Sequence, residues 1–292
     1  MKERKIAPYV YIFPTLLLII IFVYIPIIQN FYFSFFKMSS YSTVKTFVGF
    51  SNYKNIFADE IFYTAVINNT LYAVISLIFQ VGIGLCLAML LESRFVAPKL
   101  RTFFRSIYFM PSVISITVVA LIFQFVYTPD IGILNGFLKA IGMGKYSHAW
   151  LGETKTAIFS IIAMSQWQYV GYIMMLFIVA IQKIPEDIYE AADIDGATGL
   201  QKALFITIPQ VKEMTLVTSV ITVIGAFKVF SEVYVMTSGG PGNSSQVLST
   251  YLYRSAFIND EMGYASAIGV IIFIITITLS FIQIKISKSG QV

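Results

Sequence analysis

Two short groups of side chains combine the chemistry that binds a polyhydroxylated ligand. The first is the run Gln166, Trp167, Gln168 and Tyr169, and the second is Lys228, Glu232 and Tyr234. Aromatic rings stack on the C–H faces of a sugar ring, while amides and hydroxyls pair with its OH groups. We therefore expect these residues to line a substrate path. Taken singly, each also fits ordinary packing, because 16% of the chain is aromatic.

The charged members of these groups lead to two further expectations. Lys228 and Glu232 are four residues apart, a spacing that allows them either to pair on one face of a helix as a structural ion pair or to contact the substrate. Lys228 also raises the alternative of an acidic substrate, although one lysine does not define a charge-selective site. The residues leave open whether the substrate is neutral or acidic.

Catalytic and metal-binding constellations are missing from the sequence. His148 is the single histidine and Cys86 the single cysteine, so neither has a partner of its own kind for metal or disulfide chemistry. The chain also lacks the Gly-x4-Gly-Lys-Ser/Thr phosphate loop. We expect a protein that is not an enzyme and that holds no metal or cofactor itself.

Composition places the chain in a membrane. Hydrophobic residues make up 57% of it and charged residues 12%, with a mean hydropathy of +0.78, whereas soluble domains carry about 25% charge. A spanning helix needs roughly 20 apolar residues, and six stretches meet that length: 9–36, 66–91, 106–127, 156–181, 214–236 and 263–284. The expected fold is all-α and polytopic, with six transmembrane helices.

The basic residues predict the orientation. With the N-terminus inside, inner segments hold twelve Lys and Arg residues, including Arg94, Lys99, Arg101 and Arg105, against seven in the outer loops. This bias predicts that both termini are cytoplasmic. Lys2, Arg4 and Lys5 before an apolar run also suit a signal peptide, but that run is longer than a signal sequence and no cleavage site follows, so it is interpreted as the first span. No cluster of basic residues suggests nucleic-acid binding.

An inner loop over 182–213 interrupts the apolar pattern with a short amphipathic helix. Ile184, Ile188, Ala191 and Ala192 share one face, and Glu186, Glu190 and Asp193 share another. Gly196 suits a left-handed helix end, and a second short helix is expected before Pro209 breaks the chain. An ordinary interfacial helix with a solvated acidic face is the alternative interpretation.

The order of residues in this loop resembles the signature cytoplasmic loop of permease subunits in bacterial ABC importers. The matching positions are Glu190, Ala191, Ala192, Gly196, Ile206 and Pro209, with Ile208 in place of a leucine. The runs 227–230 and 234–241 resemble the carbohydrate-uptake branch of that family, in which an aspartate often follows the phenylalanine that is Phe230 here. This chain has Ser231 and then Glu232 instead.

The resemblance implies a type I importer permease fold and an ATP-driven sugar importer that works by alternating access. The residues expected to contact the ATPase are Ile188, Glu190, Ala191, Ala192, Asp195, Gly196, Ile206 and Pro209. Expected partners are a second permease, two cytoplasmic ATPase subunits that bind ATP and Mg²⁺, an extracytoplasmic binding protein, a sugar and membrane lipid. The location implied is the bacterial cell membrane.

We expect three parts in the chain: residues 1–65 with the first span and first outer loop, a transmembrane core over 66–284, and a cytoplasmic tail over 285–292. Two other functions stay open at this point. An ion-coupled secondary transporter would show repeated halves and buried coupling groups, and a non-transporting scaffold would show the same helices.

Overall fold

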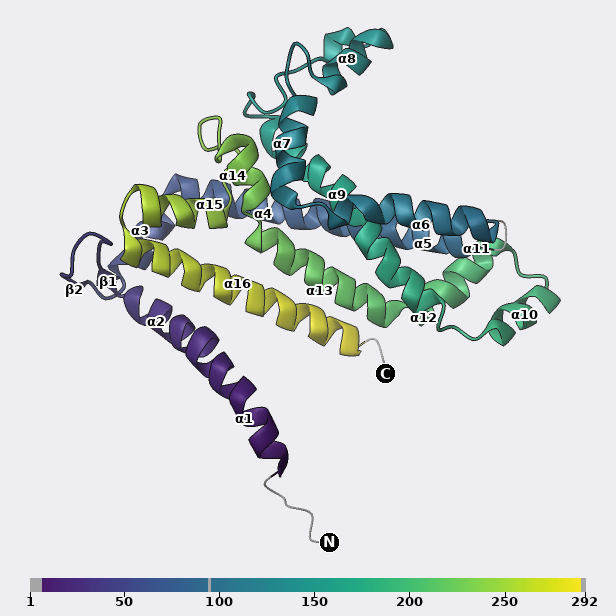
Figure 1. Ribbon diagram of the computed structural model, residues 1–292, viewed down its shortest axis with the longest axis horizontal. Helices are drawn as coiled ribbons and strands as arrows, with labels where there is room; N and C mark the ends of the chain where they lie inside the picture. The colour runs from purple at the N-terminus through teal and green to yellow at the C-terminus, as the bar shows by residue number, and fades with distance from the viewer. Residues whose placement is uncertain (1–6, 94–95, 290–292) are drawn as a thin grey trace. The chain divides into compact units, whose positions relative to one another are not determined.

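The computed structural model describes residues 7–93 and 96–289, which include almost all of the helical core (Figure 1). The regular secondary structure of these described residues is helical apart from one antiparallel pair of two-residue strands, β1 (Phe36–Lys37) and β2 (Thr46–Phe47). The all-α prediction is confirmed. Of the basic residues that predicted the orientation, Lys2, Arg4, Lys5 and Arg94 lie outside the described residues.

Four helical stretches are long and apolar enough to cross a membrane: Tyr11–Phe33, Glu60–Glu92, Ala157–Ile181 and Met262–Lys285. Two bent pairs raise the number to six if each pair counts as one span. The first pair joins α6 (Pro98–Val113) to α7 (Ile116–Val126) at 96°, and the second joins Gly199–Gln210 to α13 (Lys212–Lys228) at 68°. Six spans are thus present only as four continuous and two bent segments.

Breaks in the helices divide the third and fifth predicted spans. The stretch 106–127 is divided at Ile114 and Ser115, which are extended residues that follow Pro111 inside α6. Proline has no N–H to continue the helical ladder. The stretch 214–236 is divided as well, because α13 ends at Lys228 and α14 (Ser231–Thr237) begins after two residues.

The chain forms two compact units. Unit 1 contains residues 1–60 and 252–274, and unit 2 contains 61–251 and 275–292. The division near residue 60 lies close to the predicted end of the N-terminal part. Residues 252–274, however, join the N-terminal unit, since the start of the last helix packs against the end of the first span.

Unit 1 comprises α1 (Ala7–Ile19), a π-helical turn (Ile20–Tyr24), α2 (Ile25–Phe33), α3 (Ser51–Ala58), a π-helical turn (Arg254–Ile258) and the start of α16 (Met262–Ser289). Gly263 lets α16 approach closely, because a Cβ there would lie 1.7 Å from the carbonyl oxygen of Phe36. The Phe31 and Phe273 rings meet edge to face with centroids 5.6 Å apart. Asp260 closes the same unit, since its carboxylate accepts hydrogen bonds from the hydroxyls of Ser39 and Ser40.

Unit 2 is organised around α9 (Ala157–Ile181), which packs against α6 and α5 (Gly84–Glu92). Its apolar core includes Ala88, Leu91, Met174 and Phe177. At Gly171 the backbones of α9 and α6 nearly touch, because a Cβ there would lie 1.7 Å from the carbonyl oxygen of Tyr108. Small residues at helix crossings are typical of membrane helix packing.

The remaining elements of unit 2 are shorter. They are α4 (Glu60–Ser76) with the π-helical turn Leu77–Ile83, α8 (Ile133–Ala140), the 3₁₀ turn Gly144–Tyr146, α10 (Glu186–Ile194), α11 (Gly199–Lys202), the π-helical turn Ala203–Thr207, α12 (Ile208–Gln210) and α15 (Leu248–Tyr253). Figure 1 shows α10 at one end of this unit, beyond α11 and α12.

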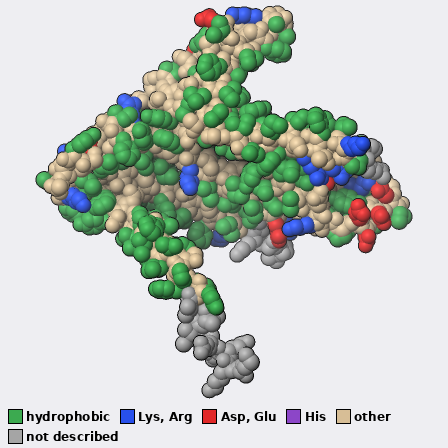
Figure 2. Space-filling view, in the orientation of Figure 1, with side chains coloured by type: hydrophobic (Ala, Val, Ile, Leu, Met, Phe, Trp, Pro, Cys, Tyr) green, Lys and Arg blue, Asp and Glu red, His purple; other side chains and the backbone are tan. Residues whose placement is uncertain are grey.

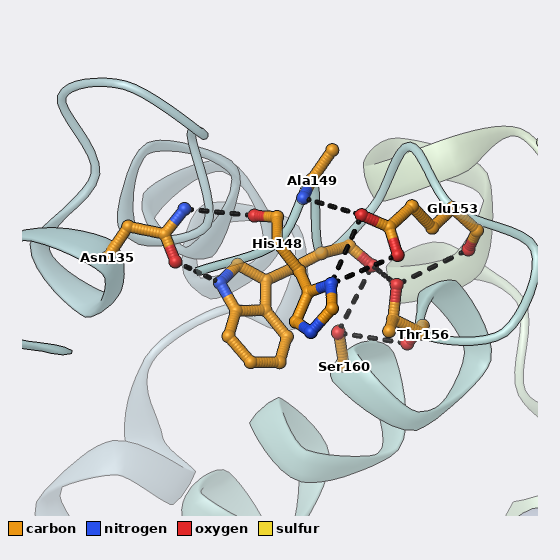
Figure 3. Close-up of polar contacts among 7 residues, drawn as sticks. Asn135, His148, Ala149, Glu153, Thr156 and Ser160 are labelled. Atoms are coloured by element: carbon orange, nitrogen blue, oxygen red, sulfur yellow. Dashed lines mark hydrogen bonds and ion pairs between the residues drawn. The ribbon is translucent and has the colours of Figure 1, made fainter. Parts of the chain in front are cut away.

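The loop between α8 and α9 is held by Asn135 and Glu153 (Figure 3). The Asn135 amide donates to the carbonyls of Pro129 and His148, and its oxygen accepts from the indole N–H of Trp150 at 2.7 Å. Glu153 accepts from the N–H of Ala149 and lies 3.2 Å from Nδ1 of His148. The single histidine therefore contributes to a local turn, in which its ring lies beside the Glu153 carboxylate (Figure 3).

Candidate functional site

A cavity of about 690 Å³ lies among the helices of unit 2. Volumes of this size are typical of small-molecule sites. Its polar wall consists of hydroxyls, one amide and two charged groups: Tyr72, Ser76, Gln80, Ser112, Ser165, Tyr169, Tyr172, Thr222, Lys228, Ser231 and Glu232. Phe230 adds an aromatic ring, which stacks on Tyr234 at a centroid distance of 5.2 Å. The wall therefore offers hydrogen-bonding groups next to aromatic faces.

The helix break before α14 exposes part of this wall. Val229 and Phe230 leave the helical conformation, and the cavity is lined along this stretch by residues 228–232. A straight helix would turn successive side chains around its axis by 3.6 residues per turn. The break instead lets several consecutive residues contribute to one cavity.

The two charged groups of the cavity do not pair with each other, so the ion-pair alternative is wrong. Glu232 is 7% exposed and accepts a hydrogen bond from the hydroxyl of Tyr72 at 2.9 Å. Lys228 is exposed, and none of the ion pairs among the described residues includes it. The reason is the helix break, which removes the regular i, i+4 spacing on which the prediction depended.

Three of the seven predicted path residues line the cavity: Tyr169, Lys228 and Glu232. The other four do not. Trp167 is 48% exposed and packs on Phe123, and the ring of Tyr234 stacks on that of Phe230. Gln166 is buried and donates to Ser76 Oγ at 3.1 Å and to the carbonyl of Ile162 at 2.9 Å.

Gln168 does not line the predicted substrate path but bonds to a backbone carbonyl at a helix break. Its amide donates to the carbonyl of Ile114, at the break between α6 and α7, over 3.0 Å. Gln124 likewise donates to the carbonyl of Val235 near the end of α14 at 2.7 Å. Backbone groups released by a helix break inside a membrane need a partner, because no water is present to supply one. These amides supply it.

Several cavity residues were missed by the sequence reasoning. Tyr72, Ser112, Ser165 and Thr222 carry hydroxyls in otherwise apolar stretches, and that signal was available. The hydroxyl of Thr222 is buried and has no hydrogen-bond partner within the described residues, although Thr222 lines the cavity. It is a further group able to bind a ligand.

The loop over 182–213 has the predicted local structure. Helix α10 ends at Ile194, Gly196 has a φ of +75°, and α11 begins after a capping box formed by Thr198 and Gln201. Helix α12 contains Pro209, and the chain bends before α13. The one shift is at the start, where Ile184, predicted to lie on one face of the helix, precedes α10, which begins at Glu186.

Two side-chain contacts fix α10 to the segment that follows it. Asp193 forms an ion pair with Lys202 at 2.7 Å, and the hydroxyls of Tyr189 and Thr207 lie 2.9 Å apart. No described residue of α10 is buried. The helix therefore stands as an exposed knob with a fixed orientation.

Both predicted faces of this knob are accessible. Exposed members of the predicted contact set are Ile188, Glu190, Ala191, Asp195, Gly196 and Pro209, while Ala192 and Ile206 are partly buried. Figure 2 shows the acidic side chains gathered at this end. The sequence reasoning missed Ile194, Leu200 and Phe205, which are 88%, 70% and 76% exposed. These three add apolar surface beside the acidic face.

Comparison with known proteins identifies the family. Residues 80–289 match the family described as binding-protein-dependent transport system inner membrane component. The chain belongs to this family. In the described ranges, no group of three or more His, Cys, Asp or Glu could hold a metal ion.

Relatives of this permease extend the match over its whole length. It is 52% identical to the probable ABC transporter permease protein YurN of Bacillus subtilis, over 99% of both chains. It is 34% identical to the arabinooligosaccharides transport system permease protein AraP of the same organism, over 98% of this chain and 90% of AraP.

Solved structures share the fold of this permease. A bacterial ABC transporter involved in the import of the acidic polysaccharide alginate has a chain that superposes with a TM-score of 0.86 at 24% identity, covering 98% of this chain and 96% of that one. A second structure shows the bacterial alginate ABC transporter in complex with a periplasmic protein that holds an alginate pentasaccharide, with a TM-score of 0.84, 25% identity and coverage of 96% and 93%. The type I importer permease fold is thereby established.

Proposed function

We propose that this chain is the membrane-spanning subunit of an ATP-driven importer that carries a sugar or oligosaccharide into the cell. Membership of the binding-protein-dependent transport family and the names of the relatives, which include transport systems for arabinooligosaccharides and for trehalose and maltose, support this function. The cargo crosses by alternating access, in which the cavity opens to one side of the membrane at a time.

The exposed knob is the observation that carries the proposal. Helix α10 buries no residue in its own chain and is nevertheless fixed by Asp193–Lys202 and Tyr189–Thr207. A rigid helix held out in this way transmits movement to or from a second protein. That protein is a cytoplasmic ATPase, which binds ATP and Mg²⁺ and supplies the energy that this chain has no phosphate loop to obtain.

The contact is formed by a mixed surface. Glu190 and Asp195 present carboxylates that suit arginines of a partner, and Ile188, Ile194 and Phe205 present apolar side chains next to them. Gly196 sets the turn between the two helices. In this arrangement both faces of α10 contribute to the ATPase contact.

The other partners follow from the same function. A binding protein outside the cell delivers the cargo, a second permease of the same family completes the pathway, and both termini of this chain are cytoplasmic. The cargo passes along the cavity wall formed by Tyr169, Lys228 and Glu232. Its hydroxyl-rich and aromatic lining suits the OH groups and C–H faces of a sugar.

Reconstitution of the complete transporter in liposomes tests this function. We expect uptake of labelled oligosaccharide that requires ATP inside and the binding protein outside. Uptake driven by an ion gradient without ATP would contradict the proposal and indicate a secondary transporter. A chain that assembles with the ATPase but moves no cargo from any of the relatives' substrate classes would instead indicate a scaffold.

Variants of the knob test the contact itself. Gly196→Val is expected to weaken co-purification of the ATPase, because a β-branched residue at a φ of +75° costs about 1–2 kcal/mol although no atom lies within 4 Å of the new Cβ. Gly196→Asn is the matched comparison and should weaken ATPase binding less than Gly196→Val, since asparagine tolerates this backbone conformation. Asp130→Ala, an exposed carboxylate in the loop after α7, serves as the control. Wild-type ATPase binding by both Gly196→Val and Glu190→Lys would refute the contact.

A further inference from the structure

Helix α4 bears three buried polar residues whose side chains bond to segments far away in the sequence. Asn68 donates to the carbonyls of Ser244 and Gln246, both at 2.8 Å, and the hydroxyl of Tyr72 donates to Glu232. Asn69, which is 0% exposed, lies between them. The chemistry of the cavity does not use Asn69, because it is not on the cavity wall.

Asn69 bridges two backbone groups that helix ends leave without partners. Its Nδ2 donates to the carbonyl of Ala226 at 2.6 Å, and its Oδ1 accepts from the N–H of Leu248 at 2.8 Å. In a continuous helix the Ala226 carbonyl would accept from the N–H four residues later, but α13 ends at Lys228. The Leu248 N–H belongs to the first turn of α15, where helical donors have no internal acceptor.

The side-chain amide of Asn69 satisfies both backbone groups from one position. It presents a donor and an acceptor on the same short side chain, whereas an ionised carboxylate only accepts and an aliphatic group does neither. Asn69 therefore stabilises the helix break at Val229 and also ties it to α15. The stretch it holds, from Ala226 to Glu232, is a wall of the cavity.

We propose that Asn69 is a positioning residue of the transport path. It holds the break between α13 and α14 so that Lys228, Phe230 and Ser231 face the cargo, and it does so without touching the cargo. The inference rests on the proposed function for the identity of the cavity as the cargo path.

A thiol-accessibility experiment on the complete transporter tests this role. Ser231→Cys, in a Cys86→Ser background, places a reporter on the cavity wall with little change in size. Asn69→Asp keeps the shape of the side chain but removes the donor to Ala226, and Asn69→Leu removes both bonds. Thr70→Val is the matched control, since Thr70 is exposed and its hydroxyl bonds only to Val66 within α4.

Loss of the Asn69 bonds is expected to change the labelling rate of the reporter about fivefold to tenfold. The KM for delivered cargo should change with it, while Thr70→Val leaves both at the parent values. A purely structural role would lower the amount of assembled transporter but would not alter either quantity per assembled complex. Parent labelling rate and KM in assembled Asn69→Asp would overturn the proposal.

If Asn69→Leu does not assemble, the isosteric Asn69→Asp decides the question by the same criteria. The outcomes also separate this inference from the proposed function. Absence of ATP-dependent uptake in the parent transporter refutes the function, whereas the labelling comparison in the same vesicles still reports whether Asn69 positions the segment around Ser231.

Discussion

Replacing Gly171 by alanine is expected to separate α6 and α9 and to reduce both stability and uptake. The new Cβ would lie 1.7 Å from the carbonyl oxygen and 2.3 Å from the carbonyl carbon of Tyr108, whereas ordinary contact begins at 3.4 Å. Both obstructing atoms belong to the backbone, so no side-chain rotation relieves the clash. Ser112 on α6 and Tyr169 on α9 line the cavity, and separating the helices changes the distance between them.

The magnitude follows from the cost of overpacking, which is typically about 1–3 kcal/mol. At about 2–4 °C per kcal/mol for a chain of this size, the melting temperature of the purified permease should fall by about 2–12 °C. Gly82→Ala is the matched control, because Gly82 is exposed and no atom lies within 4 Å of its added Cβ. Equal melting temperatures and equal uptake for the two variants would refute the close approach of α6 to α9.

Three further predictions concern the charged groups. Asp193→Lys and Lys202→Asp should each reduce ATP-driven uptake, and the double exchange should restore it. Because the pair is partly exposed, the coupling free energy between the two residues in a double-mutant cycle should be about 0.2–1 kcal/mol. Uptake by the double variant that is no better than uptake by the single variants would contradict this. The hydroxyls of Ser39 and Ser40 hold the pKa of Asp260 below its ordinary value of 3.8, so its stabilising effect is fully present above pH 3.8 and is lost as the pH falls through the lowered pKa. The melting-temperature difference between the parent and Asp260→Asn should therefore shrink in acid, and a difference that grows would be incompatible with it. Parallel transport assays of Lys228→Met with acidic and with neutral cargo test whether Lys228 selects for charge. A far larger loss of acidic than of neutral uptake would indicate that selection, and an equal loss would exclude it.

Local signals were enough to predict much of the fold. Hydropathy identified the membrane helices, and Gly196 identified the end of α10, because both depend on residues close together in the sequence. The helix breaks at Ile114 and Val229 were not predicted. The groups that stabilise them, Gln168 and Asn69, lie 54 and 157 residues away along the chain from the carbonyls they cap. A pattern among neighbouring residues therefore cannot contain both the amide and the carbonyl that it caps.

The large sequence separation between hydrogen-bond partners also explains why only part of the cavity lining was predicted. A polar residue within a membrane span either lines a pathway or pairs with another polar group of the protein. The polar residues in apolar stretches were interpreted as ligand contacts. Tyr169, Lys228 and Glu232 do line the cavity, whereas Gln166 and Gln168 satisfy hydroxyl and backbone groups. The sequence presents the two kinds of residue identically, and only the positions of the helix breaks distinguish them.

The helix breaks and their amide partners form one system with the cavity. A break lets the consecutive residues 228–232 contribute to the wall, but it also releases backbone groups that hydrocarbon cannot solvate. Asn69, Gln124 and Gln168 satisfy those groups from neighbouring helices. A cavity with a different lining can therefore arise by changing the wall residues while the amides stay in place, whereas loss of an amide changes the wall whatever its lining. Substitutions that alter cargo preference are accordingly expected among residues 228–232, and substitutions that impair transport of every cargo alike are expected at the amides.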